Sequence, residues 1–241
     1  MKQPHINCDE NDIHSAVIVC GDPARVERIA RLGNNPRHIS TNREFTVWET
    51  GFNHQPISIC STGIGGVSAL IALEELCRCG AQRIIRVGSA GALQTTVKLG
   101  ELIVVEGAIR HDGASASYIE SAYPAIADFK LTAQLCQALE TLKVHNYHCG
   151  LVRSHDSFYT DKEDEICAYW SQQGVLGADM ETGALLTLGR LRKLQVAAIL
   201  CNVVEYQASL ESSINEYKDS ADLLATGERL AALAALQALA N

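Results

Sequence analysis

The chain has 241 residues, of which 47% are hydrophobic, and its formal net charge is −8. This length and composition predict a soluble protein with a sizeable core, and the acidic balance argues against a nucleic-acid or anionic membrane partner. The nine cysteines are scattered, the first residues begin no apolar signal region, and we expect the longest apolar stretches to be too short to span a bilayer, so we expect a cytoplasmic location and no membrane partner.

Strands and helices are predicted to alternate along the whole chain. Several predicted strands are continuous apolar runs, which are typical of strands buried on both faces. In chain order, we expect strand 15–20, helix 25–32, strands 45–50 and 56–61, helix 67–77, strands 83–87 and 102–108, helix 131–142, strand 150–154, helix 182–191, strand 196–204 and helix 221–240. This alternation predicts an α/β fold in one domain, residues 1–241, around a parallel or mixed sheet.

Three arginines stand at or near the ends of predicted strands: Arg25, Arg43 and Arg86. Because the chain as a whole is acidic, a local cluster of arginines indicates a specific anionic ligand. Together the three arginines predict a pocket for a small dianion such as phosphate. Arg86 lies in an apolar run, and a buried arginine needs an anionic partner. The turn at 88–91 beside it offers backbone N–H groups and a hydroxyl to phosphate oxygens. Arg25 taken alone fits a solvated helix residue equally well.

A second group, Asp179-Met180-Glu181, opens an apolar helix. Acidic residues are common in a first helical turn because they complement the helix dipole, and that interpretation needs no ligand. In the alternative interpretation, the two carboxylate oxygens of Glu181 accept hydrogen bonds from both hydroxyls of a ribose. The residues alone leave both interpretations open.

Six short motifs occur in order along nearly the whole chain. They are Gly21-Asp22-Pro23 with Arg25, Asn42-Arg43-Glu44-Phe45, Ser61-Thr62-Gly63-Ile64-Gly65-Gly66, Glu74-Glu75-Leu76, Ile85-Arg86-Val87-Gly88-Ser89-Ala90-Gly91 and Met180-Glu181. Together they resemble the uridine phosphorylase branch of the hexameric nucleoside phosphorylases, the purine/uridine phosphorylase family. The resemblance implies a single-domain, three-layer αβα fold with a central mixed β-sheet. It also implies reversible phosphorolysis, a pentosyltransferase (glycosyltransferase) reaction of nucleoside salvage that converts nucleoside and phosphate into free base and ribose 1-phosphate.

The resemblance also implies roles for individual residues. Phosphate, the co-substrate, would be held by Gly21, Arg25, Arg86, Ser89 and, from the neighbouring subunit, Arg43. The ribose would be held by Met180, Glu181 and the neighbour's His5. Positioning of phosphate by the arginines, with Arg86 in a catalytic role, is the main contribution of the protein. No redox cofactor or catalytic metal is implied.

Two further implications concern assembly. Glu44, Ile64 and Ser68 match positions where this branch can hold a monovalent cation such as K⁺ between subunits, although Glu44 could equally pair with a local arginine. A site that borrows residues from a neighbour requires at least a homodimer. The family usually closes as a trimer of such dimers, a symmetric hexamer.

The expected base pocket departs from the family pattern. Uridine phosphorylases carry a glutamine and an arginine shortly after a Phe-Tyr pair, but here Lys162 and Asp164 follow Phe158, the residue expected to stack near the sugar and base. Purine-cleaving relatives carry an aspartate after the late strand, and the nearest acid here is Glu205. Glu205 would be the general acid if it were buried, although a surface glutamate fits as well. His155-Asp156, just before Phe158, offers another polar contact.

Several functions therefore remain open. The first is a phosphorylase acting on uridine or a related nucleoside, with purine nucleosides as the alternative substrates. The second is a nucleoside hydrolase of the same fold, against which the full arginine set weighs. The third is a non-catalytic nucleoside-binding or phosphate-binding relative, which the altered base pocket would explain.

Overall fold

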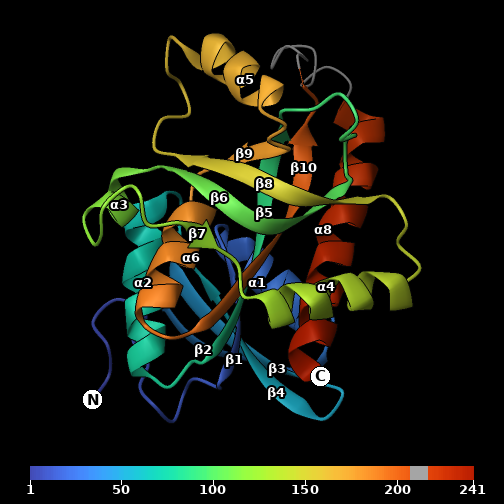
Figure 1. Ribbon diagram of the computed structural model, residues 1–241. Helices are drawn as coiled ribbons and strands as arrows, with labels where there is room; N and C mark the ends of the chain where they lie inside the picture. The colour runs from blue at the N-terminus through green and yellow to red at the C-terminus, as the bar shows by residue number, and fades with distance from the viewer. Residues whose placement is uncertain (207–216) are drawn as a thin grey trace.

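The computed structural model of the chain describes residues 1–206 and 217–241 (Figure 1). The strands are β1 (Ala16–Cys20), β2 (Asn34–Asn42), β3 (Phe45–Phe52), β4 (Gln55–Ser61), β5 (Arg83–Ala92), β6 (Leu102–His111), β7 (Ala125–Ile126), β8 (Tyr147–His155), β9 (Gly177–Asp179) and β10 (Gln195–Val204). The helices are α1 (Pro23–Ala30), α2 (Gly66–Arg78), α3 (Gly113–Ala116), α4 (Phe129–Thr141), α5 (Glu163–Gln172), α6 (Thr182–Leu191) and α8 (Tyr217–Ala240).

The strands form one mixed sheet in the order β10-β6-β8-β9-β5-β1-β4-β3-β2, with β7 on β6. β10 pairs with β5 as well as with β6, so β5, β10, β6, β8 and β9 close into a ring. β1 is parallel to both β4 and β5, whereas β2, β3 and β4 are joined antiparallel. The prediction of an α/β fold around a central mixed sheet is confirmed.

One edge of β5 changes its partner halfway along the strand. β10 occupies the other edge over residues 83–91. On the changing edge, β1 pairs as far as Val19 with Arg86, and β9 begins at Ala178 with Gly91. Residues 87–90 therefore lie on a stretch of edge that neither strand covers. Ligands of α/β proteins bind at such switch points, outside the carboxyl ends of the strands.

Helices cover both faces of the sheet. Val17 and Ile84 belong to the core under α2 and α6, whereas their neighbours Ile18 and Ile85 belong to the core under α1, α4 and α8. Successive residues of a strand point to opposite faces, so both faces of β1 and β5 are buried. Figure 1 shows α2 and α6 on the side of the sheet opposite α4 and α8, as expected of three layers.

The last helix corrects one expectation. Ala221–Ala240 is long and apolar enough, by length and composition alone, to cross a membrane, so the expectation that every apolar stretch is too short is wrong. In the fold, however, α8 packs against α4 and the sheet, where Ala231, Ala235, Leu236 and Leu239 have no exposed surface. We therefore assign its apolar surface to the core.

The predicted elements are all present, with ends that differ by a few residues. β2, α3, β7, α5 and β9 were not predicted. β2 is mostly polar and exposed and contains Pro36, as suits an edge strand, so it carries no apolar pattern. β9 has three residues and is recognisable only by its pairing with β5 and β8.

Candidate active site

A cavity of about 720 Å³ lies at the switch point of β5. This volume is in the range of small-molecule sites. Eleven residues predicted from the sequence line it: Gly21, Arg25, Glu44, Ile64, Ser68, Arg86, Ser89, His155, Phe158, Met180 and Glu181. The fold thus brings together most of the predicted phosphate, ribose and cation groups.

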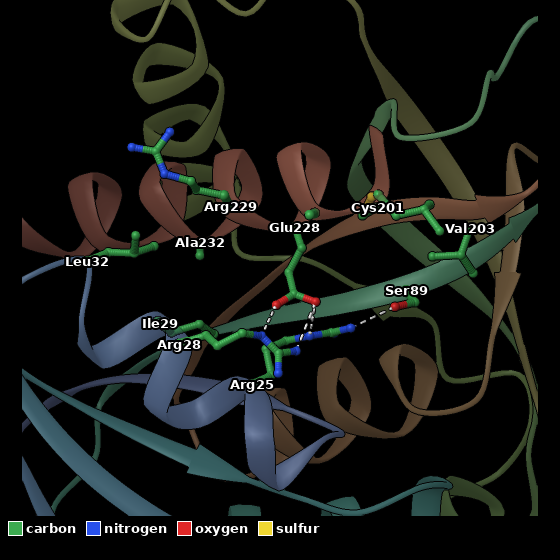
Figure 2. A pocket seen from close by; sticks show the side chains of 12 residues that line it. Arg25, Arg28, Ile29, Leu32, Ser89, Cys201, Val203, Glu228, Arg229 and Ala232 are labelled. Carbon is green, nitrogen blue, oxygen red and sulfur yellow. Dashed lines mark hydrogen bonds and ion pairs between the residues drawn. The ribbon is translucent and has the colours of Figure 1, made fainter. Parts of the chain in front are cut away.

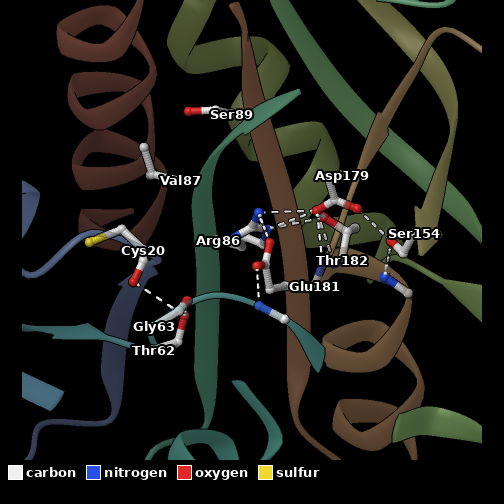
Figure 3. A network of polar contacts seen from close by, with 12 residues as sticks. Cys20, Thr62, Gly63, Arg86, Val87, Ser89, Ser154, Asp179, Glu181 and Thr182 are labelled. Atoms are coloured by element: carbon white, nitrogen blue, oxygen red, sulfur yellow. Dashed lines mark hydrogen bonds and ion pairs between the residues drawn. The ribbon is translucent and has the colours of Figure 1, made fainter. Parts of the chain in front are cut away.

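Arg86 is the buried centre of the site (Figure 3). Its Nη2 donates to Glu181 Oε2 at 2.6 Å, and its Nε donates to Asp179 Oδ2 at 3.2 Å. Burial alone would lower the pKa of Arg86, but the charges of Glu181 and Asp179 outweigh it and raise the pKa, so the guanidinium stays charged. Among the described residues, no partner meets its buried Nη1. One donor of this cation is therefore left for a ligand.

Two glycines shape the surroundings of Arg86. A Cβ on Gly88 would lie 2.7 Å from Arg86 Cζ and 2.7 Å from Leu200 Cδ2, so only glycine leaves room for the guanidinium. Gly65 has a φ of 91° and points its N–H at Glu181 Oε1, at 2.6 Å. A left-handed backbone of this kind is accessible mainly to glycine.

Asp179 also holds Arg86 in place, although the sequence pattern predicted no role for Asp179. Its side chain has no exposed surface. Oδ1 accepts from Ser154 Oγ at 2.5 Å, and Oδ2 accepts from Thr182 Oγ1 at 2.5 Å (Figure 3). Ser154 Oγ in turn accepts from Gly183 N at 2.7 Å. The network therefore ties the arginine to β8, β9 and the start of α6.

Arg25 is held by an acid that the sequence did not reveal, Glu228 of α8 (Figure 2). Arg25 Nε donates to Glu228 Oε2 at 3.0 Å, and Arg25 Nη2 donates to Ser89 Oγ at 3.1 Å. Glu228 Oε1 also accepts from Arg28 Nε at 2.9 Å. These side chains line a second cavity of about 520 Å³ between α1 and α8. Arg25 is therefore an oriented residue, not a solvated one.

Two predicted residues lie apart from the cavity of their own chain. Arg43 is exposed in the turn between β2 and β3, with a φ of 55°. His5 Nδ1 lies 2.6 Å from Glu75 Oε1, and the His5 amide also donates to this carboxylate. Their assignment to a neighbouring subunit's site stays a prediction.

Three residues predicted for base recognition and proton transfer do not come to the cavity. Lys162 and Asp164 are exposed at the start of α5. Glu205 is exposed, and its Oε1 accepts from the amide of Leu99 at 3.4 Å. None of the three is among the described residues that line the cavity, whereas Phe158 is.

The predicted cation residues form a small group of oxygen atoms. Glu44 Oε1 accepts from Ser68 Oγ at 3.0 Å, and Ile64 beside them is 79% exposed. The amide of Glu44 itself, the hydroxyl of Ser68 and the charges of Arg43 and His5 lower the pKa of Glu44. A charged carboxylate with a hydroxyl suits a hard cation. Within the described residues, no group of three or more His, Cys, Asp or Glu could hold a metal ion.

Comparison with known proteins identifies the family. Residues 15–237 match the sequence model of the Phosphorylase superfamily. The guanosine phosphorylase of Halorubrum lacusprofundi is 37% identical over 84% of this chain and 83% of its own length, and the uridine phosphorylase of Escherichia coli is 35% identical over 82% and 85%. The crystal structure of uridine phosphorylase from Vibrio fischeri ES114 is 54% identical, with a TM-score of 0.94 over 99% of this chain and 97% of that chain. The chain therefore belongs to the phosphorylase superfamily.

Proposed function

We propose that this protein is a nucleoside phosphorylase of the uridine phosphorylase type, a pentosyltransferase. The observation that carries the proposal is the buried Arg86, held by Asp179 and Glu181 at the switch point of β5, beside Arg25 and Ser89. Relatives named uridine phosphorylase, among them the 54% identical Vibrio fischeri protein, support it.

Phosphate would bind at the uncovered edge of β5. The hydroxyl of Ser89, the guanidiniums of Arg25 and Arg86 and the backbone at Gly21 line this end of the cavity. Oriented guanidiniums match the oxygens of phosphate, and they need no reorganisation during the reaction. The proposed nucleophile is therefore held by groups that the fold has already placed.

The ribose would bind at Met180 and Glu181. Each carboxylate oxygen of Glu181 already accepts one bond, from Arg86 or from Gly65, and each keeps a second lone pair for a ribose hydroxyl. As the glycosidic bond lengthens, the sugar becomes oxocarbenium-like and the base gains negative charge. A phosphate oxygen then bonds to C1′, the electron pair of the broken bond leaves with the base, and the base takes up the proton that the hydrogen phosphate loses overall. Positioning supplies most of the catalysis.

The charges around the phosphate position support a second subunit. Arg86 faces two carboxylates, and Arg25 is paired with Glu228. A phosphate dianion would add negative charge to a site that these acids already balance. The exposed guanidinium of a neighbour's Arg43 would offset part of this added charge, with the neighbour's His5 reaching the ribose.

The surface beside the cavity also suits a subunit contact. The apolar side chains of Ile64 and Val67 are 79% and 68% exposed there. Exposed apolar groups that adjoin a site are typical of an interaction surface. We therefore propose a homodimer that shares its sites and assembles into a hexamer.

The remaining requirements are simple. Phosphate is the co-substrate, and no redox cofactor is needed. A potassium ion would be held between subunits by Glu44, Ser68 and the main chain of Ile64, where it would fix the dimer contact. We place the enzyme in cytoplasmic nucleoside salvage, which agrees with the free state of its nine cysteines.

A panel of nucleosides tests the proposed function. Uridine, inosine, guanosine, cytidine and adenosine are incubated with and without phosphate, and the free base and ribose 1-phosphate are quantified. We expect phosphate-dependent release that Arg86→Ala abolishes and that Arg192→Ala, which removes a surface pair with Glu74, preserves. Release without phosphate would indicate a hydrolase. The guanosine phosphorylase relative makes a 6-oxopurine nucleoside the second candidate substrate.

A further inference from the structure

The base end of the cavity has one polar side chain among the described residues. The groups proposed for phosphate, ribose and cation are set aside first, together with four residues adjoining them, Asp22, Pro23, Gly88 and Asp179, whose two carboxylates are already bonded to Arg28 and Arg86. The rest of the lining consists of Gly63, Ala90, Gly91, His155, Phe158, Ala178 and Val203. His155 alone among these carries a side chain that can form hydrogen bonds. Recognition of a base by side chains in this part of the site therefore falls to His155.

The sheet holds His155 in place. It is the last residue of β8, and its backbone pairs with His111 of β6. Only 8% of its surface is exposed, so packing restricts the ring. Phe158, in contrast, lies in the segment after the strand and is 55% exposed. Groups on strands are placed more accurately than groups on loops.

The hydrogen bond of His155 determines what the ring offers a ligand. Nδ1 lies 2.8 Å from the carbonyl oxygen of Ser157. A carbonyl oxygen only accepts, so Nδ1 carries the proton and donates it. In the neutral ring Nε2 then holds a lone pair and is an acceptor. No described residue forms a hydrogen bond with Nε2.

We propose that His155 Nε2 accepts a hydrogen bond from a ring N–H that flanks a carbonyl of the base. Uracil offers such a group at N3, and hypoxanthine and guanine offer one at N1. Cytosine N3 and adenine N1 carry lone pairs instead, so two acceptors would face each other in a partly buried site. His155 therefore makes the enzyme select oxo bases over amino bases. This inference rests on the proposed function, because it names the substrate class of the same site.

Substrate analogues test the inference without altering the protein. 3-Methyluridine lacks the ring N–H, whereas 5-methyluridine carries the same methyl group elsewhere and keeps it. In the wild-type enzyme, kcat/KM for 3-methyluridine should fall about 10- to 100-fold below that for 5-methyluridine, as expected when a buried acceptor loses its donor. Equal values for the two analogues would overturn the inference.

Variants test whether His155 is the group responsible. In His155→Leu the preference for uridine over cytidine, and for inosine over adenosine, should fall about 10- to 100-fold, while the KM for phosphate stays unchanged. His155→Gln keeps an acceptor oxygen and should retain part of the preference. Phe158→Ala, the matched change at the same end of the cavity, should lower uridine and cytidine turnover together and preserve their ratio.

Binding of free bases separates this inference from the proposed function. Calorimetric titration with uracil, cytosine, hypoxanthine and adenine needs no turnover. Tighter binding of uracil and hypoxanthine that is lost in His155→Leu would support the inference even if phosphorolysis were absent. Phosphorolysis with unchanged base preference in His155→Leu would overturn the inference and leave the proposed function standing. The turnover rates measured with uridine and with inosine show whether the natural substrate carries a pyrimidine or a purine base.

Discussion

Glu228 of α8 orients Arg25 of α1, although the two residues are separated by 203 positions in the sequence. Arg25 Nε lies 3.0 Å from Glu228 Oε2, and the other side of the guanidinium reaches Ser89 Oγ at 3.1 Å. Helix α8 thus determines the orientation of Arg25, a residue that we propose donates hydrogen bonds to phosphate.

Removing this carboxylate should weaken phosphate binding selectively. In Glu228→Ala, Arg25 loses a charge-assisted hydrogen bond, so we expect the KM for phosphate to rise about tenfold with little change in the KM for the nucleoside. Glu228→Gln, which keeps one acceptor oxygen, should recover part of the loss. Steady-state kinetics at varied phosphate measures both, and Glu27→Ala, which removes the pair with Arg31 on α1, is the control. An unchanged phosphate KM in Glu228→Ala would contradict an orienting role.

A methyl group added at Gly88 should displace Arg86 and thereby lower activity. Its Cβ would lie 2.7 Å from Arg86 Cζ and from Leu200 Cδ2, so Arg86 must move. We expect Gly88→Ala to lower kcat/KM about 100-fold and the free energy of unfolding by about 1–3 kcal/mol. Gly51→Ala is the control, because its Cβ would meet Asn34 O at 3.5 Å, an ordinary contact. An unchanged kcat/KM in Gly88→Ala would show that activity does not require Arg86 in its present position.

Neutralising Asp179 should cost stability as well as activity. Asp179→Asn leaves Arg86 with one carboxylate instead of two in a buried site, and breaking buried pairs typically costs about 3 kcal/mol. Urea unfolding measures this loss. Asp128→Asn changes a capping carboxylate at the start of α4 to another good cap, so its cost should be a few tenths of a kcal/mol, on the order expected for caps. Equal stabilities of the two variants would refute the stabilising role of the network.

Glu49 should contribute to stability in a pH-dependent way. Burial raises its pKa, but hydrogen bonds from Arg37 (2.8 Å) and His14 (3.1 Å) outweigh burial and lower it. The folded pKa is thus below the unfolded value, so the stabilisation is complete above about pH 4.3 and is lost as the pH falls through the folded pKa.

Glu49→Gln tests this titration. The variant should lose less than about 1 kcal/mol at pH 7, because Arg37 is largely exposed. The difference between wild type and variant should shrink as denaturation is repeated at lower pH. A difference that is constant between pH 7 and pH 3 would rule out the proposed titration.

The phosphate and ribose groups were predictable because they lie on strongly patterned elements. β1 and β5 are apolar runs that pair in parallel as far as Val19 and Arg86, so Gly21 and Ser89, which lie just beyond that pairing, line the same cavity. Met180 and Glu181 open the apolar helix α6, which the sequence also marks clearly.

The rest of the site depends on contacts that leave no local pattern. Asp179 contacts Ser154 only because the short β9 pairs with β8. Glu228 lies on α8, whose sequence shows an apolar pattern that gives no sign of a contact with Arg25. Counting residues after Phe158 led to Lys162 and Asp164, but the fold starts α5 at that point. Acids in a first helical turn suit the helix dipole, so Asp164 there needs no substrate.

The stoichiometry of the products distinguishes phosphorolysis from hydrolysis. Uridine and phosphate are incubated with the enzyme, and phosphorus NMR follows ribose 1-phosphate while absorbance follows uracil. We expect one ribose 1-phosphate for each uracil released, and no release when phosphate is omitted. Release of uracil together with free ribose, at a rate that does not depend on phosphate, would rule out phosphorolysis.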